Sequence, residues 1–223
     1  ACVAPAAAAQ RYTDRPEVRQ FIAEMAERHA FAERTLERLF ATVRVQDSVL
    51  ALIAPPPGGS RSWRVYRSNF VNARRIEAGV AFWRANAAAL ERAAREFGVP
   101  PEIVVAIIGV ETEYGRNLGG YRVLDALATL AFDYPRRADY FRWELEQYLQ
   151  LARESRLDAR SVRGSFAGAI GIAQFMPGSI RRFALDFDGD GRIDLAASGA
   201  DAIGSIANFL REHGWASGAP VAL

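Results

Sequence analysis

The sequence predicts a mostly α-helical protein. Apolar residues recur at intervals of three and four along most of its 223 residues, which is the spacing of one face of a helix. No stretch alternates apolar and polar residues over the length of a strand, and no internal repeat is found. Half of the residues (50%) are hydrophobic, which is enough to bury one large core or two small ones.

The first half of the chain contains four expected helices. Pro16 suits the first position of a helix, and an apolar stripe follows it at Val18, Phe21, Ile22 and Met25. After a second helix, the Pro- and Gly-rich run at 55–59 interrupts the chain. The other three helices are expected at 32–43, 62–70 and 73–97. The last of these is rich in Ala, Arg and Glu, which have high helix propensity.

The second half of the chain contains a buried helix and a glycine-rich segment. The residues at 98–101 end one helix and begin the next, in which residues 102–110 are nearly all apolar. Residues 164–178 are rich in glycine and poor in charge, which indicates a packed, irregular segment around a site. Further helices are expected at 123–131, 135–155 and 201–212.

Composition excludes several kinds of partner. The net charge is +2, far from the dense basic surface of a nucleic-acid-binding protein, so no nucleic acid is expected. No run of 18 or more apolar residues is present, so no helix is expected to span a membrane. The two histidines, His29 and His213, lack the spacing of metal ligands. The single cysteine, Cys2, excludes an intrachain disulfide.

The first residues resemble the mature start of a bacterial lipoprotein. A small residue precedes Cys2, and a loose Ala- and Pro-rich tract follows at 3–10. Acyl chains on Cys2 would anchor the protein to the outer membrane; the alternative is a chance cysteine in a frayed terminus. We expect a flexible tether (1–14), an N-terminal helical subdomain (15–97) and a C-terminal core (98–223).

Glu111 ends the apolar helix and is a candidate acid catalyst. It follows Ile107 by four residues and Ile108 by three, so the three side chains share one face. Apolar surroundings raise the pKa of a carboxyl, which can then donate a proton to a glycosidic oxygen near neutral pH. The alternative is a helix-end glutamate paired with an arginine. Glu113 lies about 200° further round the helix and is expected on a more polar side.

The motif at 111–115, Glu-Thr-Glu-Tyr-Gly, resembles the E-T-x-Y/W-G signature of the membrane-bound lytic transglycosylase B family. Further similarities follow the order of the family along the chain. They are Val-Pro-Pro-Glu at 99–102, Ile-Ile-Gly-Val at 107–110, Leu-Asp-Ala-Leu-Ala-Thr-Leu at 124–130, Tyr-Pro-Arg-Arg at 134–137, Gly-Ser-Phe-Ala-Gly-Ala at 164–169, Gln-Phe-Met-Pro at 174–177, Asp-Ala-Ile-Gly-Ser at 201–205 and His-Gly-Trp at 213–215.

This resemblance implies a goose-type, lysozyme-like catalytic core at 98–223 that cleaves the MurNAc–GlcNAc bond of peptidoglycan. It implies that Glu111 acts twice, first protonating the bond oxygen and then removing the proton of the MurNAc C6 hydroxyl to close a 1,6-anhydro ring. No catalytic cofactor is expected, and the N-acetyl group of the substrate takes the place of a second carboxylate. Asp125 and Asp133 are interpreted as a helix-starting residue and a turn residue.

The resemblance also implies a glycan-binding cleft. Ser165 would lie beside Glu111 and contact the N-acetyl group, and Arg136 and Arg137 would bind stem-peptide carboxylates. Aromatic and methionine side chains cover sugar rings, while amides bind their hydroxyl groups. The other cleft residues would be Tyr66, Gln174, Phe175 and Met176. The alternatives are core packing for the aromatic and methionine side chains, and solvated charges for the arginines.

An acidic loop at 186–194 has the pattern of an EF-hand. Carboxylates stand at positions 1, 3 and 5, a glycine stands at position 6, and such hard oxygen ligands suit Ca²⁺. Position 12 is Ala197 instead of the usual glutamate, and the resemblance implies that a later aspartate closes the site. The expected ligands are Asp186, Asp188, Asp190, Arg192 through its backbone carbonyl, and Asp201. We expect a structural Ca²⁺; the alternative is a turn without an ion.

The expected setting is the periplasm of a Gram-negative bacterium, where a monomer would act on peptidoglycan glycan strands. Members of the family usually continue with a small β region and a returning helical segment that carries a Tyr-Asn pair, and neither is found before Leu223. Two other functions stay open. One is a muramidase, which adds water at the same bond, and the other is a non-catalytic peptidoglycan-binding module.

Overall fold

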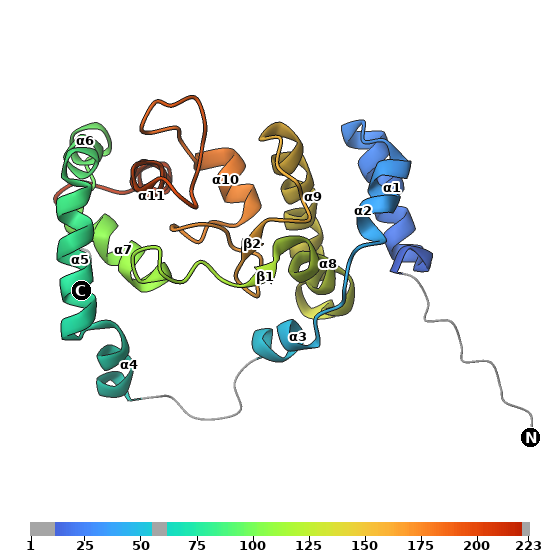
Figure 1. Cartoon of the computed structure of the whole chain (residues 1–223), viewed down its shortest axis with the longest axis horizontal. Coiled ribbons are helices and arrows are strands. Elements are labelled where there is room, and N and C mark those ends of the chain that lie inside the picture. Colours follow the sequence, from blue (N-terminus) through green and yellow to red (C-terminus); the bar gives the residue numbers. More distant parts are fainter. Residues whose placement is uncertain (1–11, 55–61, 220–223) are drawn as a thin grey trace, which may run out of the picture.

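The fold is a series of helices joined by loops, with one short sheet near its centre (Figure 1). The structure, a computed structural model, describes residues 12–54 and 62–219. Predictions made for Cys2, for the tract at 3–10 and for the break at 55–59 fall outside the described residues. In the described part of the chain, the prediction of a mostly α-helical protein is confirmed.

The N-terminal helices pack against the middle of the chain. The predicted stripe of Val18, Phe21, Ile22 and Met25 is confirmed as the buried face of the first helix. These side chains share one core cluster with the two central helices. The elements are η1 (Tyr12–Asp14), α1 (Pro16–His29), α2 (Glu33–Phe40) and α3 (Asp47–Ile53), packed on α8 (Val123–Asp133) and α9 (Ala138–Glu154).

Residues 12–14, the last part of the expected tether, pack on the core. Tyr12 is buried, and its hydroxyl donates a hydrogen bond of 2.9 Å to the Ala128 carbonyl oxygen in α8. Its ring also packs edge-on against Phe132. A flexible tether that includes residues 12–14 is therefore wrong, because an aromatic side chain anchors this stretch to the core.

The single helix expected at 73–97 is wrong. The chain forms α5 (Ala73–Ala85) and α6 (Ala87–Phe97), which follow α4 (Trp63–Phe70). Asn86 separates them with φ −119° and ψ 20°, and its side-chain amide donates back to the Phe82 carbonyl oxygen at 2.9 Å. Asparagine competes for helix hydrogen bonds in this way, and high propensity in its neighbours did not prevent the break.

A second core cluster forms around the apolar helix. Val104 and Ile108 of α7 (Pro101–Thr112) are fully buried against α6 and against α11 (Gly199–Glu212). Gly98, in the left-handed conformation with φ 68°, ends α6 and lets the chain reverse into α7. The helix predicted at 102–110 and the helix predicted at 201–212 are both confirmed.

A two-stranded sheet lies between the two clusters (Figure 1). Strands β1 (Tyr121–Arg122) and β2 (Arg163–Gly164) pair antiparallel, with Tyr121 opposite Gly164. Strands of two residues are too short to show an alternating pattern, so the sequence did not predict them. The remaining elements are η2 (Pro135–Arg137) and α10 (Pro177–Phe183).

Five of the described helices before residue 98 divide between the two clusters. Helices α1 to α3 join α8 and α9, whereas α5 and α6 join α7 and α11. The division of the chain into subdomains at residue 97 stays a prediction. Among the helices in the described ranges, each is too short or too polar to cross a lipid bilayer.

Candidate active site

Glu111 lies in the last turn of α7. Its side chain is exposed and does not share the buried environment of Ile108, because α7 leaves the core at this turn and the buried face of the helix continues at Thr112. Partial desolvation nevertheless raises the pKa of the Glu111 carboxyl above its ordinary value of 4.5. The negative end of the α7 dipole disfavours a carboxylate here as well.

The three residues after Thr112 make a left-handed turn. Glu113, Tyr114 and Gly115 have φ values of 52°, 62° and 83°, a region that side chains other than glycine rarely adopt. The Tyr114 hydroxyl lies between α5 and α7, where a Cβ on Gly79 or Gly109 would come within 2.5 or 2.6 Å of it. The two glycines thus leave room for the Tyr114 ring between α5 and α7.

Thr112 joins the end of α7 to the glycine-rich segment. Its hydroxyl is buried, donates to the Ile172 carbonyl oxygen at 2.9 Å and accepts from the Gly115 N–H at 3.0 Å. One side chain therefore fixes both the left-handed turn and the segment at 164–178. The sequence analysis did not assign Thr112 a role, although its place inside the 111–115 motif was a signal.

The next three carboxylates after Glu111 in sequence are neutralised by arginines. Each forms an ion pair: Glu113 with Arg74, Asp125 with Arg122 at 3.4 Å, and Asp133 with Arg15 at 2.8 Å. Asp125 also accepts a hydrogen bond from the Arg44 N–H. Within the described residues, Glu111 forms no such ion pair, and no cation lowers its pKa against the effect of desolvation.

Ser165 begins a tight loop directly after β2. Its hydroxyl oxygen accepts hydrogen bonds from the N–H groups of Ala167 at 3.3 Å and Ala169 at 3.0 Å. Its own N–H donates to the Ala169 carbonyl oxygen at 2.9 Å. The hydroxyl is half-buried and has a proton left to donate, which suits contact with an acceptor on a ligand.

Gln174, Phe175 and Met176 follow on the same segment. Gln174 has φ 49°, and its amide nitrogen donates to the carbonyl oxygens of Leu118 and Gly171. Phe175 pairs with Ile170 through two backbone hydrogen bonds of 2.8 and 3.2 Å and packs its ring against α11. Met176 contacts the first cluster. All three are half-buried, so each contributes to packing and keeps part of its surface accessible.

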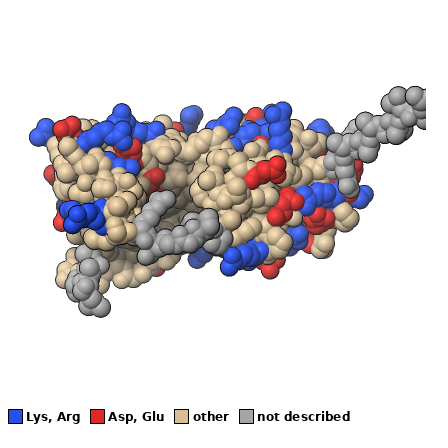
Figure 2. Space-filling view, turned by 90° about the horizontal axis from the view of Figure 1, so that it is seen from below, with Lys and Arg blue, Asp and Glu red and all other residues tan. Residues whose placement is uncertain are grey.

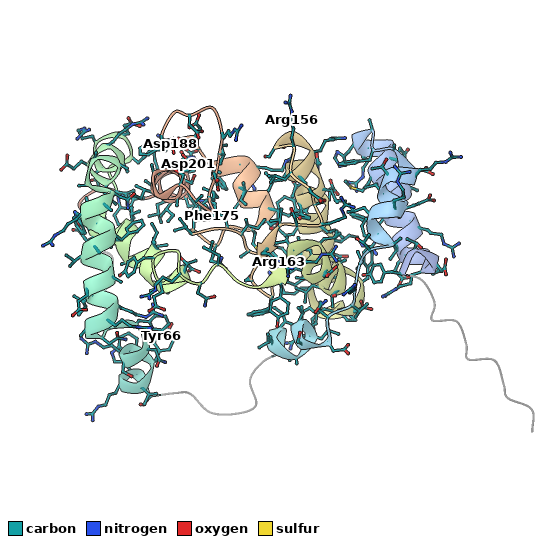
Figure 3. The ribbon with its side chains drawn as sticks, viewed as in Figure 1. Tyr66, Arg156, Arg163, Phe175, Asp188 and Asp201 are labelled. Carbon is teal, nitrogen blue, oxygen red and sulfur yellow. The ribbon has the colours of Figure 1, made fainter. Side chains whose placement is uncertain are left out.

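Tyr66, Arg136 and Arg137 lie on other elements. Tyr66 stands on α4, near the start of α5, while Phe175 lies in the central region (Figure 3). It is 46% exposed and stacks on Trp63 at 5.8 Å between ring centroids. Both arginines are exposed in η2, and Arg137 lies 4.2 Å over the Tyr140 ring. The Thr112–Ile172 hydrogen bond joins the glycine-rich segment, which carries Ser165 and residues 174–176, to the end of α7. Whether Ser165 lies beside Glu111 stays a prediction, as do the cleft positions of Tyr66 and the two arginines.

The surface is hollowed between the part that contains α4 and α5 and the part built around α8 (Figure 2). Separately, a pocket of about 450 Å³ lies between α5 and α7. It is lined mainly by apolar side chains, including Ile76, Val80 and Trp83, and by Tyr114 from the 111–115 motif. The predicted site residues are not among the described residues that line it.

The acidic loop brings three carboxylates together. One oxygen each of Asp186, Asp188 and Asp190 lie within 4.8 Å of one another, which fits a hard cation. Asp201 is buried, and its carboxylate binds the backbone of the loop. Its oxygens accept backbone N–H groups of Phe187 at 2.7 Å and of residue 194 at 2.8 Å, and it is not one of the three carboxylates that lie within 4.8 Å of one another. Asp188 and Asp201 both lie at this loop (Figure 3). Arg192 is exposed.

A model of the transglycosylase SLT domain matches residues 13–223. The chain belongs to this family. It is 45% identical over 221 residues to the membrane-bound lytic murein transglycosylase B of Escherichia coli strain K12, an alignment that covers 95% of this chain and 61% of the relative. The chain thus spans less than two thirds of the length of this SLT-domain relative.

Two solved structures of SLT-domain proteins superpose on the chain. Lytic transglycosylase Slt35 from Escherichia coli, in complex with calcium, has a TM-score of 0.89 and 46% identity, covering 94% of this chain and 67% of its own. SltB3 from Pseudomonas aeruginosa, in complex with NAG-anhNAM-pentapeptide, has a TM-score of 0.82 and 32% identity, covering 92% and 54%. The helical fold implied by the 111–115 motif and its companions is therefore confirmed.

Proposed function

We propose that this chain is a lytic transglycosylase that cleaves the MurNAc–GlcNAc bond of peptidoglycan, with Glu111 as its single general acid and base. One observation carries this proposal. Glu111 is the carboxylate at the end of α7 that forms no ion pair within the described chain, and its pKa is raised. The names of the aligned relatives, lytic transglycosylases and a complex with an anhydro-muramyl ligand, support the same reaction.

The proposed reaction transfers one proton in each direction. The protonated Glu111 gives its proton to the bridging oxygen as the bond from that oxygen to C1 of MurNAc breaks. The N-acetyl oxygen of the same sugar shares the positive charge at C1, which accounts for the absence of a second free carboxylate near the end of α7 in the described chain. The Glu111 carboxylate then takes the C6 hydroxyl proton as O6 bonds to C1. No water is consumed, and no cofactor takes part.

The proposed substrate contacts come from the glycine-rich segment. The Ser165 hydroxyl proton can bind an N-acetyl carbonyl, and the Gln174 amide oxygen can accept from a sugar hydroxyl, since the amide nitrogen is already used. The accessible surfaces of Phe175 and Met176 suit the apolar face of a pyranose. Tyr66 would add a stacking surface from α4, and Arg136 and Arg137 are exposed for stem-peptide carboxylates.

The test is mass spectrometry of a digest of purified peptidoglycan. The proposal predicts 1,6-anhydro-muramyl ends, and a Glu111→Gln variant that is folded but releases no soluble fragments. Glu113→Gln, two residues away, is the matched control and keeps the product unchanged. Reducing ends in place of anhydro ends would show a muramidase, and undiminished lysis by Glu111→Gln would exclude this glutamate as the acid.

We also propose that Asp186, Asp188 and Asp190 bind a structural Ca²⁺, with the Arg192 backbone carbonyl as a further ligand. The three carboxylates converge on one point, and calcium is present in the Slt35 structure named above. Asp201 would support the site by holding the loop backbone.

The test of this site is thermal unfolding with and without Ca²⁺. Because a ligand that binds the folded state stabilises that state, Ca²⁺ at about one hundred times its Kd would add about 2.7 kcal/mol to the free energy of unfolding. Scanning calorimetry should show a higher Tm with Ca²⁺ and no shift in an Asp186→Asn, Asp188→Asn double variant; an equal Tm with and without Ca²⁺ in the wild type would refute the site.

The proposed setting follows from the substrate. Peptidoglycan glycan strands lie in the periplasm of Gram-negative bacteria, and acylation of Cys2 would hold the enzyme at the outer membrane there. A monomer suffices, because the proposed acid and glycan contacts all come from one chain. Labelling with a radioactive fatty acid tests the anchor directly, since a Cys2→Ser variant would lose the label.

A further inference from the structure

Glu144 is a buried carboxylate that the proposed reaction does not use. It lies in α9, and 2% of its surface is exposed. Burial raises the pKa of its carboxyl, while hydrogen bonds from the Gly178 N–H and the Tyr140 hydroxyl act in the opposite direction. Among the described residues it forms no ion pair. Burying a carboxyl group without a cation costs free energy, and hydrogen bonds to its oxygens offset part of that cost.

The carboxylate caps the start of another helix. Its Oε2 accepts the Gly178 N–H at 2.8 Å, and Gly178 is the second residue of α10. The preceding residue, Pro177, has no N–H, and Met176 at the N-cap position offers no side-chain hydrogen bond. Glu144 therefore supplies from α9 the cap that the local sequence of α10 lacks.

The fit around this cap leaves little freedom. A Cβ on Gly178 would lie 2.4 Å from the Trp143 ring atom Cζ3 and 3.3 Å from Glu144 Oε2. The Arg137 guanidinium lies over the Tyr140 ring, whose hydroxyl contacts the carboxylate. The beginning of α10 is thus held in one position against α9.

The residues directly before this cap are the proposed glycan contacts. Gln174 and Met176 lie between two anchors, the Thr112–Ile172 hydrogen bond on one side and the Glu144–Gly178 hydrogen bond on the other. Gln174 is also held in a left-handed conformation at φ 49°, which the chain adopts only if its surroundings impose it. Losing either anchor would let the segment relax.

We propose that Glu144 is a positioning residue for glycan binding: by capping α10 from α9, it fixes Gln174, Phe175 and Met176 in the arrangement that receives the sugar. This inference rests on the proposed function of the segment at 174–176. It assigns Glu144 no contact with substrate and no proton transfer. Its consequence is specific, because loss of the cap should weaken substrate binding more than it slows the chemistry at Glu111.

The test compares two buried glutamates of the same helix. Glu146, two residues further on and 8% exposed, directs its carboxylate to Arg28 and His29 of α1 in the described part of the chain. We expect Glu144→Leu to raise KM for a soluble glycan about tenfold, equivalent to about 1.4 kcal/mol, with a smaller change in kcat. Glu146→Leu should lower the free energy of unfolding about as much as Glu144→Leu does, and its KM should equal that of the wild type.

Conservative variants separate positioning from stability. Glu144→Gln retains an oxygen that accepts the Gly178 N–H, so it should restore a near-wild-type KM. Glu144→Asp is one methylene shorter and should not reach Gly178, so its KM should rise even if Glu144→Leu fails to fold. A wild-type KM in a folded Glu144→Asp or Glu144→Leu variant would overturn the inference, as would an equal rise in Glu146→Leu.

A failure of the proposed function would be recognised separately. If the wild type binds glycan but releases no anhydro ends, the reaction is refuted and the Kd for the same glycan replaces KM as the readout. A Kd that is tenfold weaker in Glu144→Asp but unchanged in Glu146→Leu would then support the positioning role. Equal Kd values in both variants and the wild type would refute it.

Discussion

Replacing Thr112 with valine tests whether the end of α7 is held in place by one hydroxyl group. Valine has nearly the same shape, but it removes the donor to the Ile172 carbonyl oxygen and the acceptor for the Gly115 N–H. A buried polar group left unpaired costs about 1–3 kcal/mol. The Ile172 carbonyl is enclosed and Gly115 is half-buried, so the free energy of unfolding should fall by about 2–4 kcal/mol.

The same change should affect catalysis, because Thr112 is adjacent to Glu111. A shift of about 1 Å between reacting groups can reduce a rate by about a hundredfold, so we expect kcat/KM to fall at least tenfold. Urea unfolding followed by circular dichroism measures the first quantity, and release of labelled glycan at a temperature where the variant stays folded measures the second.

Thr129→Val is the matched control for this experiment. Thr129 is also fully buried, and its hydroxyl accepts the Gln46 N–H at 3.1 Å, which joins α8 to the start of α3 instead of to α7. It should lose stability and keep kcat/KM. A wild-type kcat/KM in Thr112→Val would refute the link between this hydroxyl and the position of Glu111. A fall in the free energy of unfolding below about 0.5 kcal/mol would refute the structural role of the hydroxyl, because a loss that small is typical of surface substitutions.

The raised pKa of Glu111 gives two further predictions. Since the carboxyl must carry its proton when the glycosidic bond breaks, kcat/KM should fall as pH rises through its pKa, which lies above 4.5; a plot of kcat/KM against pH that shows no such limb would contradict this. A raised pKa also means that the folded state binds this proton more tightly than the unfolded state, so the carboxylate opposes folding above that pKa. Glu111→Gln should therefore have a higher Tm than the wild type at pH 7, the difference should disappear below pH 4.5, and a lower Tm at pH 7 would exclude desolvation as the cause.

The helices with strong signals were predictable from sequence. The apolar stripe after Pro16 and the apolar run before Glu111 both matched α1 and α7, because periodicity and burial agree there. Helices α3 and α10 were missed, since each has seven residues and too few turns to establish a period. The break at Asn86 comes from one side chain, whose amide binds the Phe82 carbonyl oxygen. A helix propensity summed over the neighbouring residues does not detect the effect of a single side chain.

The motif at 111–115 singled out Glu111 as a candidate from sequence, but the geometry around it was not predictable. The exposure of its side chain depends on where α7 leaves the core, which sequence does not specify. The ion pair between Glu113 and Arg74 and the cap from Glu144 to Gly178 join residues that are far apart in the chain. Only the folded arrangement reveals such partners.

The hydrogen bond between Tyr12 and Ala128 has a consequence for biosynthesis. The partner of the first buried aromatic residue emerges from the ribosome 116 residues later, after roughly 6 to 23 s of translation at about 5–20 residues per second. During that interval Phe21, Met25 and Phe40 have no completed core to enter. Nascent chains of this protein should therefore depend on chaperones, or on transit in an unfolded state, until α8 and α9 have been made.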